Sequence, residues 1–186
     1  MASLKILNPS VNDDIYAFQA GPEDEEAVRE LIMETARWLS SMGSTQWGGL
    51  LQGEDSHNLA GAIARGEVFA FRKAGEEGLA GSVILQQQPS EWDRKLWGDT
   101  EVGKGSAIFL HRLVVNRQFS GKGLGSEMMA WVEGGIQYSG KDRIKLDCIA
   151  NNEKLNRFYK QCGYTYKGEA SGWSIYEKLL PDVKVH

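Results

Sequence analysis

The N-terminal part of the chain changes from a short apolar run to a long amphipathic repeat. After a lead-in, residues 1–14, for which we expect no regular structure, residues 15–19 (IYAFQ) predict a short strand because they are rich in aromatic and β-branched side chains. Gly21-Pro22-Glu23-Asp24 predicts a helix start, with proline at the first helical position and acids in the first turn. One stripe then recurs at spacings of three and four and predicts a helix that ends near Gly43: Val28, Leu31, Ile32, Thr35, Leu39 and Met42.

The next part alternates between loops and short elements. Residues 43–57 predict a glycine-rich loop in which Trp47 covers the edge of the core, with a pocket-lining role as the alternative. Asn58 is a suitable N-cap for a short helix over residues 58–65. Residues 67–73 and 79–87 predict two strands joined by a turn at 74–78. A long polar connection, residues 88–105 with Trp92 and Trp97, should follow. It is either the rim of a substrate site or a segment without regular structure.

The centre of the chain reads as strand, glycine turn, helix and strand. Residues 107–115 (AIFLHRLVV) are apolar in both alternating sets, so we expect a central strand covered on both faces. A helix should begin at Gly125 and carry an apolar stripe from Leu124 to Ile136. Residues 143–149 (RIKLDCI) predict the next strand. This order predicts a right-handed βαβ unit with two parallel strands.

The C-terminal part predicts one more helix and a hairpin. Asn151 and Asn152 can cap a helix that runs through Cys162 and stops at Gly163. Strands over residues 164–167 and 173–179 should then pair. We therefore expect one α/β domain over residues 1–186, with an antiparallel N-terminal part and a βαβ centre.

Composition narrows the class of protein. A chain of 186 residues with 41% hydrophobic and 25% charged residues suits one globular domain. The net charge of −4, without a Lys/Arg cluster, argues against nucleic acid as a partner and leaves room for a cationic substrate. Cys148 and Cys162 do not suggest a disulfide framework, and no stretch has the composition of a signal peptide or membrane span. We expect a cytoplasmic protein with free thiols and no membrane partner.

The glycine turn is the first candidate site. Backbone N–H groups at a helix start have no partner within the helix, and glycines let a phosphate approach them. The spacing fits neither a Walker A loop nor the dinucleotide fingerprint. A tight structural turn is the alternative to an anion site. The candidate residues are Ser120, Gly121, Lys122, Gly123, Leu124, Gly125 and Ser126.

The last helix adds a second candidate. Asn152 and Tyr159 lie just under two turns apart, about 10 Å along one helix face. A phenol can protonate a leaving thiolate. The alternative is that Tyr159, beside Phe158, is an ordinary core aromatic.

Together these motifs resemble the GCN5-related N-acetyltransferase (GNAT) superfamily, over most of residues 15–180. Its loop pattern, Gln/Arg-x-x-Gly-x-Gly/Ala, fits Gly123 and Gly125, with Ser120 where Gln or Arg is usual. Shifting the register by two places fits Gln118, but we prefer the first register because the helix should begin at Gly125. The departure at Ser120 removes a side chain that usually supports the pyrophosphate. The pattern N-x-x-L-x-x-F-Y-x-x-x-G-F/Y is matched in full by Asn152, Leu155, Phe158, Tyr159, Gly163 and Tyr164.

The resemblance implies a mixed, mostly antiparallel sheet with splayed parallel strands, and acetyl-CoA between the strand ending at Val115 and the one beginning near Arg143. The backbone of Leu113, Val114 and Val115 would receive the pantetheine arm, and residues 120–126 would hold the pyrophosphate. Asn152 would support the cofactor arm, and Tyr159 would be the general acid. A neutral amine would attack the thioester directly, without a covalent enzyme intermediate.

The general base is a separate question. His111 is our leading candidate because its ordinary pKa lies near neutrality, and its L-H-x-L-x-V context is similar to that of arylalkylamine acetyltransferases. An ordinary strand histidine is the alternative. Asp147 and Glu91 are weaker candidates for the base, and His57 and His186 receive no role. No spacing of His, Cys or acidic residues suggests a metal site, so we expect none.

We therefore expect an acyl-CoA-dependent N-acetyltransferase that acts on a primary amine of a small molecule or peptide. A non-catalytic acyl-CoA-binding or regulatory module on the same fold is the main alternative, and a nucleotide-binding protein is a third. The acidic charge and Trp47, Trp92 and Trp97 favour an amine with an apolar or aromatic part. Polyamine, aminoglycoside, amino acid, protein N-terminus and lysine acceptors stay open, as does the oligomeric state, a homodimer included.

Overall fold

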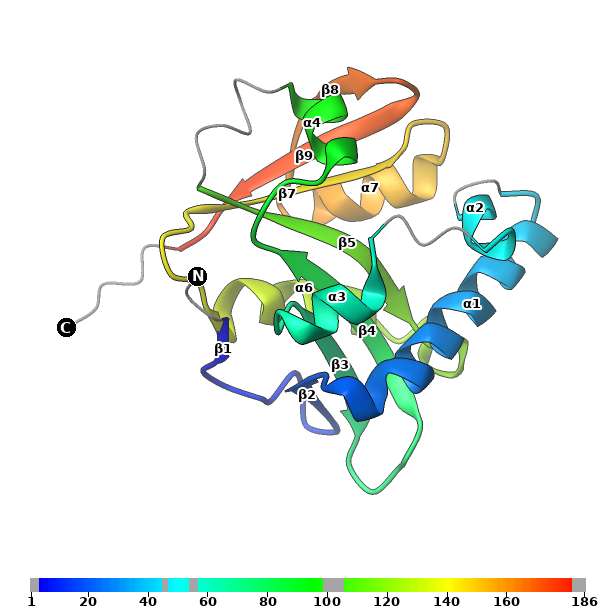
Figure 1. Cartoon of the computed structure of the whole chain (residues 1–186), viewed down its shortest axis with the longest axis vertical. Helices are drawn as coiled ribbons and strands as arrows, with labels where there is room; N and C mark the ends of the chain where they lie inside the picture. The colour runs from blue at the N-terminus through cyan, green and yellow to red at the C-terminus, as the bar shows by residue number, and fades with distance from the viewer. Residues whose placement is uncertain (1–3, 45–46, 54–56, 99–105, 182–186) are drawn as a thin grey trace.

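The fold is a mixed α/β arrangement around one large sheet (Figure 1). The structure, a computed structural model, describes residues 4–44, 47–53, 57–98 and 106–181. In this part of the chain a seven-stranded sheet has the order β2-β3-β4-β5-β7-β9-β8. Its strands are β2 (Ile15–Gln19), β3 (Val68–Lys73), β4 (Leu79–Gln86), β5 (Ala107–Val115), β7 (Arg143–Ile149), β9 (Trp173–Leu179) and β8 (Thr165–Ala170).

Two very short strands form a second sheet. Within the expected lead-in, β1 (Lys5–Ile6) pairs antiparallel with β6 (Ile136–Gln137). Leu4 beside it is buried in the main core. Ile136 was expected on the helix that follows the glycine turn, and this is wrong, because the glycines at 134 and 135 end that helix before it reaches Ile136.

The predicted helices are present, and two short ones were missed. A 3-10 turn, η1 (Pro22–Asp24), leads into α1 (Glu25–Ser41), as the proline and acids predicted. Asn58 caps α3 (Leu59–Ala64) by accepting from the Gly61 N–H. The remaining helical segments are η2 (Arg117–Phe119), α6 (Leu124–Gly134) and α7 (Glu153–Gln161). The missed helices are α2 (Gly48–Leu51), inside the predicted loop 43–57, and α4 (Glu91–Trp97), inside the connection 88–105.

Apolar side chains cover both faces of the sheet, as predicted for a central strand. On one face α1 and α3 pack over β3 and β4 through residues such as Val28, Leu59 and Ile84. On the other face α6 packs through Met128 and Trp131. In Figure 1, α1 and α3 lie in front of the sheet and α6 behind it.

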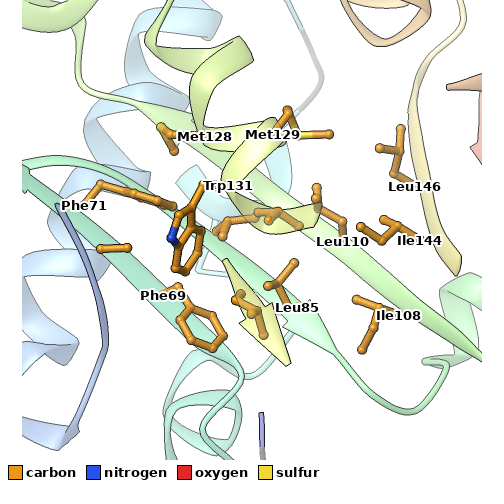
Figure 2. Close-up of a cluster of buried hydrophobic side chains, with 14 of the residues drawn as sticks. Phe69, Phe71, Leu85, Ile108, Leu110, Met128, Met129, Trp131, Ile144 and Leu146 are labelled. Atoms are coloured by element: carbon orange, nitrogen blue, oxygen red, sulfur yellow. The ribbon is translucent and has the colours of Figure 1, made fainter. Parts of the chain in front are cut away.

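Trp131 is the largest side chain that α6 places in this core. Figure 2 shows its indole beside Phe69 and Phe71 of β3, at ring-centre distances of 5.8 and 5.3 Å in edge-on geometry. Its Nε1–H donates to the Asn8 carbonyl at 2.6 Å. The indole therefore fixes both the helix and the N-terminal segment to the sheet.

The predicted βαβ unit is confirmed. β5 and β7 are parallel, with α6 between them in the chain, and they are the one parallel pair among the described strands. Their pairing covers Ala107↔Arg143 to Phe109↔Lys145 and does not continue further along either strand. The two strands therefore part in their C-terminal halves, as the resemblance implied.

A β-bulge interrupts β5 at the same level. Ser82 of β4 lies opposite Val114, but Ile84 lies opposite His111, so one residue of β4 faces two of β5. Arg112 has a φ of 51°, a left-handed conformation that is uncommon for a residue with a side chain. The expected uniform alternation along β5 is therefore wrong beyond His111. Leu110 and Leu113 pack toward the α6 face, whereas Val114 packs toward α1 and α3.

Membrane insertion of a helix finds no support in the described residues. None of their helices has both the length and the apolar character needed to cross a bilayer.

The close packing of β4 under α6 generates a stability prediction. A Cβ at Gly81 would lie 2.5 Å from the Val114 carbonyl oxygen and 2.8 Å from Met128 Cε. We expect Gly81→Ala to lower the free energy of unfolding by about 1–3 kcal/mol, because the added methyl group overpacks the interior. Urea denaturation monitored by tryptophan fluorescence measures the change.

Gly78→Ala is the matched control for Gly81→Ala. Gly78 is exposed, and a Cβ there would meet nothing within 4 Å. Its effect should stay within about 0.5 kcal/mol. Equal stabilities for the two variants would contradict the packing described for Gly81.

Candidate active site

A cavity of about 290 Å³ opens where β5 and β7 part. The strand walls come from residues just past the last paired positions, His111 and Leu113 of β5 and Asp147 of β7. Leu155 and Tyr159 of α7 form another wall. The other lining residues come from β5, β9, the loops and the short helices: Leu110, Arg112, Trp173, Trp47, Gly49, Leu50, His57 and Trp92. The gap between the strands is therefore a pocket with both apolar and ionisable walls.

The helix α4, which was not predicted, carries a buried acid, Asp93, that was not among the predicted site residues. Ser90 and Asp93 form a capping box at the start of α4, in which Ser90 Oγ accepts from the Asp93 N–H at 3.1 Å. Asp93 Oδ2 in turn accepts from the Ser90 N–H and from Ser90 Oγ–H, both at 2.9 Å. The spacing Ser-x-x-Asp in SEWD was the signal that could have located both the helix and Asp93. The cap fixes the direction of a carboxylate that is 1% exposed.

Asp93 contacts the predicted base, His111. His111 Nε2 lies 3.1 Å from Asp93 Oδ1 and 3.2 Å from Oδ2. A carboxylate accepts from Nε2–H, and in the neutral ring this leaves the lone pair on Nδ1. Burial lowers the pKa of His111, but the hydrogen bond to Asp93 and the charges of Asp93 and Asp147 outweigh it, so the pKa is raised. His111 therefore sits in the cavity wall as an oriented proton acceptor.

His57, which received no role from the sequence, stacks on His111. Their ring centres are 4.2 Å apart with planes inclined by 30°. Burial, followed by the charges of His111 and Arg112, lowers the pKa of His57 to about 2, so this ring stays neutral. Among the described residues its buried Nδ1 has no hydrogen-bond partner. Only the fold brings these two histidines together, and no sequence spacing indicated it.

Asp147, a weaker candidate for the base, lies in the opposite strand wall. Its Oδ2 accepts from Trp92 Nε1–H at 3.2 Å. The pKa of this carboxyl is raised, chiefly by burial. The charge of His111 and the Trp92 hydrogen bond oppose the rise, and the charge of Asp93 adds to it. Asp93, His111 and Asp147 each offer one possible ligand atom within 4.8 Å of the others, which their positions in the sequence did not suggest. The expectation of no metal stays a prediction.

Tyr159, the predicted acid, is buried in α7 and faces the cavity. Burial raises the pKa of its phenol, with smaller contributions from Cys148, Asp147 and Cys162. The hydroxyl is therefore protonated at neutral pH. Asn152 begins the same helix, where its Oδ1 accepts from the Leu155 N–H at 3.0 Å, as the capping prediction required.

Asn156 was not singled out from the sequence, and it holds α7 beside the parted strands. Its Nδ2 donates to the Asn152 carbonyl at 2.8 Å and to the Ile149 carbonyl at 3.2 Å. Its Oδ1 accepts from the Tyr176 hydroxyl of β9 at 2.6 Å. This one amide joins α7, the end of β7 and β9.

The glycine loop lies at the start of α6, which begins at Leu124, one residue earlier than expected. Gly121 and Gly123 have φ values of 77° and 78°, so both need the freedom of glycine. Leu124 is buried in the core, and a Cβ at Gly125 would meet Phe158 at 3.4 Å. Ser120 Oγ donates to the Arg117 carbonyl, while Lys122 and Ser126 are exposed. Anion binding by this loop stays a prediction.

The other candidates divide between the cavity and its surroundings. Trp47 lines the cavity and also packs on the α1 core, so both of its proposed roles are present. Trp97 instead packs against Ala107 and Phe109, outside the lining. Glu91 is exposed and does not line the cavity. His186 lies outside the described residues.

The contact between Asp93 and His111 generates a titration prediction. We expect Asp93→Asn to lower the pKa of His111, because the variant removes the negative charge that favours the imidazolium while burial still opposes it. Asp147, His57 and Arg112, which also face the ring, are unchanged in the variant. NMR titration of the His111 ring signals measures the change directly.

Ser90→Ala is the control that distinguishes the charge of Asp93 from the capping of α4, because it removes the Ser90 cap and keeps the Asp93 carboxylate. It should reduce stability by about 1 kcal/mol and leave the His111 pKa raised. An equal fall of the pKa in both variants would assign the effect to the loss of the cap and contradict a charge effect of Asp93.

Comparison with known proteins places this geometry in a family. The profile of the acetyltransferase (GNAT) family matches residues 26–164. The chain is 46% identical over 181 residues to the uncharacterized N-acetyltransferase YesJ of Bacillus subtilis (strain 168), covering 97% of this chain and 98% of that protein.

Solved structures agree with this comparison. A GNAT-family acetyltransferase from Listeria monocytogenes 4b F2365 superposes with a TM-score of 0.73 at 37% identity, over 89% of this chain and 95% of that one. The PaiA N-acetyltransferase of Thermoplasma acidophilum, solved with coenzyme A, shares the fold with a TM-score of 0.61 at 16% identity, over 89% of this chain and 98% of that one. The chain therefore belongs to the acetyltransferase (GNAT) family, which confirms the resemblance seen in its two sequence motifs.

Proposed function

We propose that this acetyltransferase transfers the acetyl group of acetyl-CoA to a primary amine of a small molecule or peptide by direct attack. One observation carries the proposal: the cavity between β5 and β7 has an oriented imidazole in one wall and a protonated phenol in another. These are the two proton-transfer groups that aminolysis of a thioester requires. The family membership of the chain supports the choice of reaction.

The residues around the cavity fit an extended acyl-CoA. Beyond Phe109, β5 has no pairing with β7, so the edge at Leu113, Val114 and Val115 can pair with the amides of a pantetheine arm. Residues 120–126 can offer backbone N–H groups at the start of α6 to the pyrophosphate. Asn152 lies at the start of the neighbouring helix α7 and can support the arm. The coenzyme A bound to the PaiA protein is consistent with this choice of cosubstrate.

His111 and Tyr159 have separate roles in the proton transfers of this reaction. An amine enters as ammonium and must lose a proton before it attacks, and His111 Nδ1 accepts it. The nitrogen then forms the C–N bond while the C–S bond breaks. Tyr159 donates its proton to the leaving thiolate, and the second proton that the nitrogen loses as it becomes an amide restores the phenol. Cys148 takes no part as a nucleophile, because burial raises the pKa of its thiol to about 12 and keeps it protonated.

We further propose that residues 1–186 act as one acetyltransferase domain in the cytoplasm. The free cysteines Cys148 and Cys162 support a reducing compartment.

Cosubstrate binding should be visible as thermal stabilisation. At a hundred times its dissociation constant, acetyl-CoA should add about 2.7 kcal/mol and raise the melting temperature, whereas ATP and NAD should not. Differential scanning fluorimetry measures the shift. Stabilisation by ATP or NAD alone would favour the nucleotide-binding alternative, and acetyl-CoA binding without thiol release from any amine would favour a non-catalytic module.

Gly123→Val should abolish the stabilisation by acetyl-CoA, because valine disfavours the φ of 78° that aims the loop N–H groups. Gly140→Val is the matched control, since Gly140 has a φ of 72° and equally open surroundings but lies away from the loop. The control should carry the same backbone strain and keep the shift. If acetyl-CoA still stabilised Gly123→Val, the loop would be a structural turn without a role in binding the cofactor.

Tyr159→Phe should lower kcat about a hundredfold or more and leave the affinity for acetyl-CoA unchanged, because only the proton donor is lost. Tyr164→Phe is the matched control: Tyr164 is buried, its ring centre lies 6.2 Å from that of Tyr159, and it does not line the cavity. Steady-state thiol release measures both. Unchanged turnover in Tyr159→Phe would show that Tyr159 is not the proton donor to the thiolate.

A further inference from the structure

Asp147 lines the cavity, but the proton transfers proposed above do not involve it. It is the one carboxylate among the described residues that line the cavity. Its hydrogen-bond partner is a neutral indole, Trp92 Nε1–H, and burial raises its pKa against the opposing positive charge of His111. Asp93, by contrast, is already bonded to His111 and Ser90. Asp147 is therefore the anionic group of the cavity with which a ligand can pair.

A cationic ligand would satisfy this carboxylate. Withdrawing an anion from water without a counter-charge is unfavourable, and an ammonium with its hydrogen donors supplies both charge and bonds. The possible ligand atoms of Asp147 and His111 lie within 4.8 Å of each other, so an ammonium held by Asp147 lies next to the His111 ring. The nitrogen that Asp147 binds would then be the one from which His111 removes a proton.

The walls beside Asp147 are aromatic. Trp92 of α4 and Trp173 of β9 meet edge-on, with ring centres 5.3 Å apart at 86°. The hydrogen bond from Trp92 to Asp147 fixes the indole next to the carboxylate. Trp47, Leu50 and Leu155 extend the apolar surface. Such walls favour a flat apolar group, and the cavity volume of about 290 Å³ limits its size.

We propose that the acceptor is a small primary monoamine with one aromatic group and no carboxylate of its own. Its ammonium pairs with Asp147, and its ring packs against Trp92 and Trp173. One proton then leaves for His111 Nδ1, and the neutral nitrogen forms its bond to the acetyl carbon as the C–S bond breaks. Tyr159 protonates the thiolate, and the second proton of the nitrogen returns to the Tyr159 phenolate. This inference rests on the proposed acetyl transfer and names its substrate class. One carboxylate for one ammonium favours a monoamine over a polyamine.

The first test uses the wild-type protein with acetyl-CoA and four acceptors: 2-phenylethylamine, ethylamine, phenylalanine and a lysine peptide. The value of kcat/KM for 2-phenylethylamine should exceed that for ethylamine about tenfold or more, because the ring buries apolar surface. It should exceed that for phenylalanine because the α-carboxylate, one carbon from the ammonium, would lie beside Asp147, which repels it. Equal or better turnover of ethylamine, phenylalanine or the peptide would overturn the inference and leave acetyl transfer intact. No turnover of any amine would overturn both.

The second test removes the charge of Asp147. Asp147→Asn keeps the size of the side chain and an oxygen for Trp92, and it should raise KM for 2-phenylethylamine about tenfold or more with KM for acetyl-CoA unchanged. Glu91→Gln is the matched control, because it removes an exposed carboxylate of α4 outside the cavity. An unchanged KM for the amine in Asp147→Asn would overturn the inference.

A third variant guards against a purely structural effect. Trp173→Leu should raise KM for 2-phenylethylamine and leave KM for ethylamine unchanged, because only the aromatic acceptor uses that wall. An equal rise for both amines would overturn the role of the aromatic wall. Melting temperatures and acetyl-CoA binding establish that each variant is folded.

Discussion

The loss of pairing between β5 and β7 is the constraint on which the site depends. The two strands are paired as far as Phe109 and Lys145, and the cavity lining begins at Leu110 of β5 and Asp147 of β7. At this level the β5 backbone also bulges, with Arg112 in a left-handed conformation. A parallel pair that continued to the strand ends would fill the gap with its own ladder and leave β5 no edge for a pantetheine arm.

The separation of the strands is maintained from the C-terminal side. The Asn156 amide bonds the end of β7, the start of α7 and the Tyr176 hydroxyl of β9. Tyr159 reaches the cavity one turn later on the same helix. The phenol is therefore placed by the same contacts that hold α7 beside the parted strands.

On the facing side, α4 combines a structural and a chemical function. Its capping box satisfies the helix start and at the same time directs Asp93 at His111. One residue earlier, Trp92 bonds to Asp147, and the ring centre of Trp97 at the end of the helix lies 4.5 Å from Lys145 Nζ. Side chains of β5 and β7 thus meet α4 at several points along its length. A seven-residue helix in this way organises the ionisable part of the cavity.

Local patterns determined most of the elements of this protein. The apolar runs predicted the strands, the Asn58 and Asn152 caps predicted two helix starts, and the glycine turn with the Asn152–Tyr159 segment identified the family, because each of these signals lies within a few neighbouring residues. The short helices α2 and α4 were missed because they lack an apolar stripe long enough to show a period. Tertiary structure alone decided the bulge at Arg112, which changes the face to which β5 side chains point. It also brought Asp93, His57 and Asp147 to His111, because these groups come from separate elements whose distances are set by sheet order and packing and leave no trace in the spacing of residues along the chain.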